Sequence, residues 1–160
     1  MLDLHTDYLT EDLGDDGHPR TFELHCPREF NFAYDVLDRL GTETPDRRAL
    51  RWCDDDRGLR TLTFGEMKDL SDRAASCFLS RVIRRGDVVL LVMKRHYQFW
   101  YAIMALHKIG AVAVPATNQL KKHDLVFRPE EAEASAVVCT NEGDIVDQVE
   151  AAEAEYAGRW

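Results

Sequence analysis

The chain has 160 residues, of which 45% are hydrophobic, and a formal net charge of -9. This length suits one domain with a hydrophobic core, and the lack of a long apolar run or a basic leader predicts no membrane span, signal peptide or transit peptide. The middle of the chain has more bases than acids, but it lacks the basic density and interleaved aromatic residues of a nucleic-acid binder, so we expect no nucleic-acid partner.

The start of the chain has little periodicity and is followed by a helix. Residues 1–28 contain several glycine and proline breakers, which predict a loosely attached arm. Apolar residues then recur at helical spacing from Phe30 to Leu40. We expect Gly41 to close this helix.

Two short strands are predicted next, Ala49–Cys53 and Leu59–Phe64, and together they form a hairpin. The turn between them contains an acidic triplet, Asp54 to Asp56, followed by Arg57 and Gly58. A cation site is one interpretation of the triplet. Asp and Gly are also the residues that turns require, so we favour a turn without a ligand.

A long helix follows the hairpin. Thr63 is a predicted N-cap, and Glu66 three residues later completes a capping box. We expect the helix to reach about Arg84, where the arginines complement its C-terminal dipole, and Gly86 to follow its end. The predicted buried stripe consists of Met67, Leu70, Ala74, Phe78 and either Leu79 or Val82.

The centre of the chain predicts one strand, helix, strand unit. Val88–Met93 is a continuous apolar run, as in a strand buried on both faces of a parallel sheet. Tyr97–Ile109 is apolar on nearly every side and predicts a buried helix that ends at Gly110. Ala111–Val114 is a second strand, and Pro115 ends it.

The last part of the chain repeats this pattern. A helix from about Lys121 reaches Ala132 or, because of Pro129, stops at Phe127. A strand, Ser135–Cys139, and an amphipathic helix, Ile145–Tyr156, complete the order. The fold class is therefore α/β, with a parallel doubly wound sheet, flanking helices and a small β-hairpin.

No catalytic or metal site is apparent from spacing. Cys26, Cys53, Cys77 and Cys139 are far apart, which predicts four free thiols in a reducing, cytoplasmic compartment. A nucleotide-binding α/β domain is expected to show a glycine-rich loop that cradles phosphate, and the chain has none. We therefore disfavour a free-standing Rossmann domain.

Several segments in this order nevertheless resemble the opening of the large domain of AMP-forming acyl-CoA synthetases, the adenylate-forming superfamily. They are TPDRRAL, LTFGEM, RRGDVVLLVMKRHYQFWYAIMALHKIGAVAVPATNQLKKHDLVFR and AEASAVVCTNE. Of these, VPATNQLKKHDLVFR looks most like the medium-chain branch. The resemblance covers about residues 29–156 and implies that residues 29–160 form the N-terminal subdomain of such a ligase.

The resemblance implies an enzyme that joins a carboxylic or fatty acid to coenzyme A with ATP and Mg, releasing AMP and pyrophosphate. The family's phosphate loop and catalytic lysine are absent from this chain, and we expect no cofactor bound by it alone. Gln119 matches the family's glutamine near the coenzyme A channel and is the cofactor-binding candidate; a polar loop residue that starts a helix is the alternative. The segment Asn141–Ile145 is acidic where relatives carry bases.

We therefore expect an N-terminal ligase fragment, from a truncated gene product or a split enzyme, that is inactive alone. The alternative is a non-catalytic α/β interaction module that self-associates or docks with a complementary ligase fragment. Either partner would cover an exposed apolar face and sheet edge.

Overall fold

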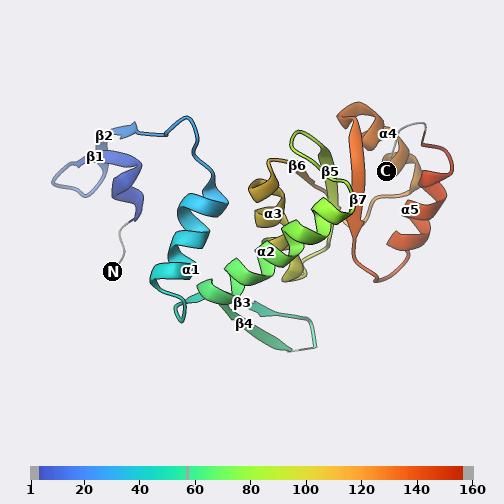
Figure 1. The fold of residues 1–160 in the computed structure, drawn as a ribbon, viewed down its shortest axis with the longest axis horizontal. Helices are drawn as coiled ribbons and strands as arrows, with labels where there is room; N and C mark the ends of the chain where they lie inside the picture. The colour runs from blue at the N-terminus through green and yellow to red at the C-terminus, as the bar shows by residue number, and fades with distance from the viewer. Residues whose placement is uncertain (1–3, 57, 157–160) are drawn as a thin grey trace.

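The computed structural model describes residues 4–56 and 58–156. It contains a three-stranded parallel sheet in the order β6-β5-β7, flanked by helices, and two antiparallel hairpins (Figure 1). The strands of the sheet are β5 (Val88–Val92), β6 (Val112–Pro115) and β7 (Ala134–Cys139). The helices around it are α2 (Phe64–Ser80), α3 (Gln98–Ile109), α4 (Lys122–Ala132) and α5 (Ile145–Glu153). The predicted α/β class is confirmed.

The central strand β5 places alternate side chains on the two faces of the sheet. Val89 and Leu91 belong to a core that includes Leu106 of α3. Leu90 and Val92 belong to a second core with residues of α4 and α5. Because α3 covers one face and α4 and α5 cover the other, the sheet is doubly wound, as predicted.

The helix α3 ends as its sequence predicts, at Gly110, whose φ of 72° lies in the left-handed region. Its burial is less complete than the sequence predicts. Ala105 and Leu106 are fully buried, but the Trp100 side chain is 49% exposed. An aromatic ring is therefore open to solvent beside the sheet.

The helix α2 has the predicted capping box, in which Glu66 N–H donates to Thr63 Oγ1 and Thr63 N–H donates to the Glu66 carboxylate. The prediction that it reaches Arg84 is wrong, because Val82 has a φ of 68° and Ile83 N–H turns back to the Phe78 carbonyl at 3.1 Å. Leu79 and Val82, the predicted alternatives for the stripe, are both exposed, and Ile83 is buried in their place.

Replacing Val82 by glycine is expected to raise the free energy of unfolding by about 0.5 to 1 kcal/mol. A β-branched residue in the left-handed region is strained by roughly 1 to 2 kcal/mol, and glycine relieves that strain. Glycine also makes the unfolded chain more flexible, which offsets part of the gain. Thermal unfolding measures the effect. Leu79→Gly, at an exposed position with helical backbone, is the matched control and is expected to lower stability; a loss in both variants would contradict the argument.

The N-terminal helical segment continues through Gly41. A π-helix, η2 (Ala33–Asp38), runs directly into α1 (Arg39–Glu43), so the expectation that Gly41 closes the helix is wrong. Gly41 is buried where α1 crosses α2. A Cβ atom there would lie 2.8 Å from Lys68 Cβ and 2.9 Å from the Phe64 carbonyl oxygen. Close approach of the two helices, and not helix termination, requires the glycine.

Replacing Gly41 by alanine tests this account, because helix propensity and packing predict opposite signs. Alanine is favoured over glycine in a helix by about 1 kcal/mol. We expect packing to dominate, with a net loss of about 1 to 2 kcal/mol, since the obstructing Phe64 carbonyl belongs to the backbone and cannot rotate away. Urea unfolding decides the sign; a stabilised variant would show that the helices separate easily.

The helix α4 continues through the buried Pro129 to Ala132, so the longer of the two predicted helices is correct. The helix α5 ends at Glu153, and is therefore shorter than the predicted helix, which reaches Tyr156. Tyr156 instead donates a hydrogen bond of 2.9 Å to the Ala134 carbonyl at the start of β7. This contact ties the end of α5 to the sheet.

The predicted hairpin is present as β3 (Arg48–Cys53) and β4 (Leu59–Thr63). In its turn, Gly58 N–H donates to the Asp54 carboxylate at 2.5 Å, which is turn chemistry. Within residues 4–56 and 58–156, no group of three or more His, Cys, Asp or Glu side chains is arranged to hold a metal ion. The hydrogen bond from Gly58 to Asp54 supports the turn interpretation of the acidic triplet.

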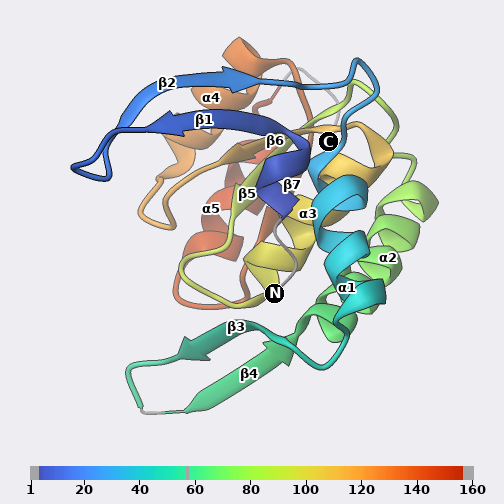
Figure 2. The same ribbon diagram turned by 90° about the vertical axis from the view of Figure 1, so that its left-hand side faces the viewer.

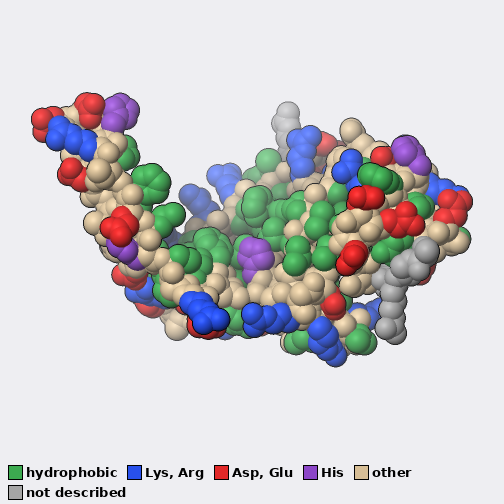
Figure 3. Space-filling view, turned by 90° about the horizontal axis from the view of Figure 1, so that it is seen from above, with side chains coloured by type: hydrophobic (Ala, Val, Ile, Leu, Met, Phe, Trp, Pro, Cys, Tyr) green, Lys and Arg blue, Asp and Glu red, His purple; other side chains and the backbone are tan. Residues whose placement is uncertain are grey.

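A second hairpin lies in the segment for which the sequence predicts no strands. A short 3₁₀ helix, η1 (Leu4–Asp7), precedes β1 (Leu9–Leu13) and β2 (Pro19–Leu24). Leu9 pairs with Leu24, and Phe22 lies two residues before Leu24 on the same face of the hairpin, so these apolar residues gather there. Figure 2 shows the two hairpins at opposite ends of the view, and Figure 3 shows hydrophobic side chains on the side of this arm that faces the body across a hollow.

Candidate functional site

The carboxyl ends of the three parallel strands bring three loops together. The loop after β5 contains Lys94, Arg95 and His96, the loop after β6 leads to Gln119, and the loop after β7 contains residues 140–144. The helices that follow β5 and β6 lie on opposite faces of the sheet. Parallel α/β sheets bind ligands in the crevice that such a reversal creates.

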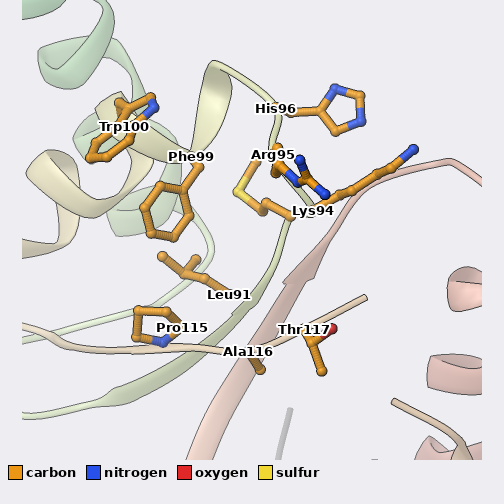
Figure 4. Close-up of a pocket in the computed structure, with 10 residues that line it drawn as sticks. Leu91, Lys94, Arg95, His96, Phe99, Trp100, Pro115, Ala116 and Thr117 are labelled. Carbon is orange, nitrogen blue, oxygen red and sulfur yellow. The ribbon is translucent and has the colours of Figure 1, made fainter. Parts of the chain in front are cut away.

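A cavity of about 480 Å³ opens at this edge between the ends of β5 and β6. Leu91, Phe99 and Pro115 form an apolar wall, while Lys94 and His96 extend away from it (Figure 4). Its other lining residues are Met93, Arg95, Trp100, Ala116 and Thr117. The cavity combines an apolar surface with a basic rim.

The acidic segment after β7 is paired with these basic side chains. Lys94 Nζ lies 3.3 Å and His96 Nε2 lies 3.1 Å from the Glu142 carboxylate. Hydrogen bonding from Lys94 holds the pKa of Glu142 below its usual value, and Lys121, 2.7 Å from Asp144, lowers the pKa of that carboxyl in the same way. The negative charge that the sequence places here is therefore balanced by bases of the neighbouring loops.

Trp52 of β3 attaches the hairpin to this site, and sequence reasoning did not identify it. Its indole N–H donates to the Arg95 carbonyl at 2.6 Å, and its ring stacks on His96 with centroids 6.4 Å apart. A second cavity, of about 250 Å³, lies between the hairpin turn and the loop after β5. The position of Trp52 fits the ordinary alternation of side chains along a strand, so the sequence pattern gave no indication of this contact.

Gln119, the predicted coenzyme A contact, lies at the same edge of the sheet but does not line either cavity. Its side chain is exposed, and its backbone N–H donates to Thr117 Oγ1 at 3.3 Å. The loop therefore presents the Gln119 amide to solvent. Its role in cofactor binding stays a prediction.

Comparison with known proteins identifies the family of this chain. The model of the AMP-binding enzyme family matches residues 37–158, which include the whole parallel sheet and its helices. The chain belongs to the AMP-binding enzyme family. The predicted resemblance is thus confirmed.

Mitochondrial acyl-coenzyme A synthetases are among the similar curated proteins. Mouse mitochondrial acyl-coenzyme A synthetase ACSM1 is 30% identical over 145 residues, which are 87% of this chain and 25% of that protein. Human mitochondrial ACSM3 is 31% identical over 123 residues, 73% of this chain and 21% of that protein. The chain therefore spans about a quarter or less of the length of these relatives.

A solved relative has the same fold. The benzoate CoA ligase of Burkholderia xenovorans superposes with a TM-score of 0.66 and 32% identity, over 81% of this chain and 25% of the ligase chain. No helix among the described residues is long and apolar enough to cross a membrane. Since both curated relatives are named as mitochondrial, the cytoplasmic location stays a prediction.

Proposed function

We propose that this chain provides the N-terminal part of an AMP-forming acyl-CoA ligase. In the reaction, a carboxylate oxygen attacks the α-phosphorus of ATP and pyrophosphate leaves; the thiol of coenzyme A then attacks the acyl carbon and AMP leaves. The observation that carries the proposal is the family match over residues 37–158, supported by 30% identity to a named acyl-coenzyme A synthetase. Fatty acids and related carboxylic acids are the proposed substrates.

The chain alone is proposed to be inactive. Adenylation needs groups that hold the ATP phosphates and Mg²⁺ and stabilise the transition state at phosphorus. The cavity at the carboxyl edge of the sheet offers an apolar wall and bases, and the Gln119 amide lies outside it in the neighbouring loop. The apolar wall and the bases can contact only part of a bound ligand. ATP, Mg²⁺ and coenzyme A would therefore be held together with residues of a complementary ligase part.

A chimera tests the function. It joins this chain to the part of the Burkholderia xenovorans benzoate ligase that lies outside the matched quarter, and it is assayed for pyrophosphate release with ATP, Mg²⁺ and benzoate. We expect release by the chimera and none by the purified chain of 160 residues. Release by the chain alone would refute the proposed inactivity, and a folded chimera without release would refute the proposed function.

In the same chimera, Gln119→Ala is expected to raise the KM for coenzyme A by about fivefold, because one amide hydrogen bond is worth roughly 1 kcal/mol. The KM for ATP is expected to change little. Asn118→Ala, at the preceding position of the same loop, is the matched control. Equal effects of both variants would indicate a disturbed loop and contradict a specific contact by Gln119.

The second candidate is a non-catalytic module that self-associates or docks with a ligase part. The hairpin of β1 and β2 favours it, since Phe22 and Leu24 are 65% and 67% exposed on its apolar face. Sedimentation of the chain alone over a range of concentrations measures self-association. Monomers throughout, together with an active chimera, would favour the ligase.

A further inference from the structure

The loop after β5 holds a base that lacks an acidic partner. Lys94 Nζ and His96 Nε2 both lie close to the Glu142 carboxylate, at 3.3 and 3.1 Å. Arg95, between them, forms no ion pair with an acidic side chain in residues 4–56 and 58–156. Its side chain is exposed and lines the cavity of about 480 Å³ (Figure 4). The Arg95 guanidinium is therefore a cation of this loop that is available to a ligand.

The backbone of Arg95 is held from two sides. Its carbonyl accepts a hydrogen bond of 2.6 Å from the Trp52 indole N–H, and the Trp52 ring stacks on His96. On the other side, Glu142 of the loop after β7 pairs with the side chains of Lys94 and His96. The Arg95 main chain is thus fixed while its guanidinium stays unpaired among the described residues, which is the arrangement of a preorganised binding group.

Lys94 adopts a strained backbone conformation in the same loop. Its φ of 45° lies in the left-handed region, which is unfavourable for a residue with a Cβ atom. His96 N–H donates to the Met93 carbonyl at 3.1 Å and so closes a tight turn around Lys94. Such strain persists only where surrounding contacts fix the conformation, and it is concentrated at functional sites. The contacts from Trp52 and from the loop after β7 fix it here.

The cavity beside Arg95 favours an anion that carries an apolar group. None of the described residues that line it is acidic, and Leu91, Phe99 and Pro115 form its apolar wall. A guanidinium binds carboxylate and phosphate oxygens through two parallel N–H donors. The apolar wall lowers the local dielectric constant, which strengthens these hydrogen bonds. The cavity thus places a free cation next to a hydrophobic surface.

We propose that Arg95 binds the oxyanion of an amphipathic ligand, either a carboxylate or a phosphate ester with an apolar group, and that Trp52 positions Arg95 for this contact. The site is distinct from the predicted coenzyme A contact, because Gln119 does not line the cavity. Binding needs only this chain and so goes beyond the proposed ligase function. That function would supply both kinds of oxyanion, one in the acid and one in the nucleotides.

NMR titration of the purified chain of 160 residues with benzoate and with phenyl phosphate tests the site. The two probes share a ring and differ in the oxyanion, and benzamide is the uncharged control. We expect at least one anion to bind in the millimolar range and to shift the amides of Lys94–His96. Benzamide is expected to bind at least about tenfold more weakly, because hydrogen bonds between charged groups are the stronger ones. A preference for benzoate assigns the site to the acid, and a preference for phenyl phosphate assigns it to a nucleotide.

Two arginine variants separate a specific contact from an effect of net charge. Arg95→Ala is expected to weaken binding of the preferred anion at least about tenfold. Arg95→Lys keeps the charge without the paired donors, so its affinity is expected to lie between those of Arg95→Ala and the unchanged chain. Arg51→Ala is the matched control, because Arg51 is exposed on β3 and lines neither cavity; it is expected to change the affinity less than about twofold. Equal effects of Arg95→Ala and Arg51→Ala would overturn the site.

Trp52→Phe tests the positioning role. Phenylalanine keeps a ring that can stack on His96 but lacks the N–H that donates to the Arg95 carbonyl. We expect about fivefold weaker binding of the anion and unchanged binding of benzamide, since one hydrogen bond is lost. In the Arg95→Ala background the same change is expected to have no further effect, because Trp52 acts through Arg95. An equal loss in both backgrounds, or an equal loss for benzamide, would show general loosening and overturn the positioning role.

The outcomes separate this site from the proposed function, since binding is measured in the chain alone and pyrophosphate release in the chimera. Binding that depends on Arg95, together with a folded chimera that releases no pyrophosphate, supports the site and refutes the ligase function. An active chimera together with a chain that binds neither anion supports the ligase function and overturns the site. Anion binding that is unchanged in Arg95→Ala places the contact elsewhere and overturns the inference.

Discussion

Replacement of Lys108 by methionine is expected to lower the free energy of unfolding by about 3 kcal/mol, because it removes the cation from a buried group of charges. The Lys108 side chain is 1% exposed, and its ammonium lies 2.7 Å from Asp38 and 2.5 Å from Asp72. It joins η2, α2 and α3, and it lies 5.6 Å from the centre of the Tyr34 ring. Without it, the Asp38 carboxylate, whose side chain is 15% exposed, loses the cation that lies 2.7 Å from it.

The matched control is Lys68→Met. Lys68 contacts the same Asp72 at 3.0 Å, but from the outer side, with a side chain that is 32% exposed. Exposed pairs of this kind contribute less than about 1 kcal/mol. Urea unfolding of both variants gives the comparison. Equal losses would show that burial of Lys108 adds nothing to the ion pair.

Lys108 also makes stability depend on pH. Burial raises the pKa of Asp72, but hydrogen bonds from Lys108 and Lys68 outweigh it, and the net pKa lies below the ordinary value of 3.8. A depressed pKa in the folded state contributes stability above the unfolded pKa, which is lost as the pH falls through the folded pKa. We therefore expect Lys108→Met to weaken the acid-dependent loss of stability attributable to Asp72. An unchanged slope in unfolding experiments across acidic pH would contradict this assignment.

Leu106→Ala is expected to cost about 2 to 5 kcal/mol, since it removes a fully buried side chain and leaves a cavity that the sheet cannot fill. Leu106 of α3 is 0% exposed and packs with Val89 and Leu91 of β5. Leu79→Ala, at a position of α2 that is 43% exposed, is the control and is expected to cost less than about 1 kcal/mol. Urea midpoints at unchanged m-value measure both; a small loss at Leu106 would show that α3 is loosely packed on the sheet.

These two sites differ in how visible they are in the sequence. Leu106 lies in an apolar helix between two apolar strands, and this pattern predicts a buried residue directly. Lys108 lies two positions later and reads as a basic residue at a helix C-terminus, which suggests exposure. Its burial depends on Asp38 and Asp72, which are distant in sequence. No local pattern contains that information.

The candidate site shows the same division. A parallel sheet places the loops that follow its strands at one edge, and in the structure the loops that contain Lys94 and Gln119 both lie at that edge. The contact of Trp52 with Arg95 and His96 was missed, because it joins a hairpin to a separate sheet. The pairing of Glu142 with Lys94 was missed because the two residues are 48 positions apart in the sequence and follow different strands of the sheet.

Local signals in the sequence were enough to predict the central strand, helix, strand unit with its left-handed Gly110, the capping box at Thr63, and the hairpin turn at Asp54. The need for Gly41 within a helix, the end of α2 at Ser80 before the left-handed Val82, and the burial of Lys108 follow only from the three-dimensional arrangement. The physical reason is that hydrophobic periodicity, caps and turns act over a few neighbouring residues, whereas close helix approach, left-handed strain and buried charge depend on groups that folding brings together.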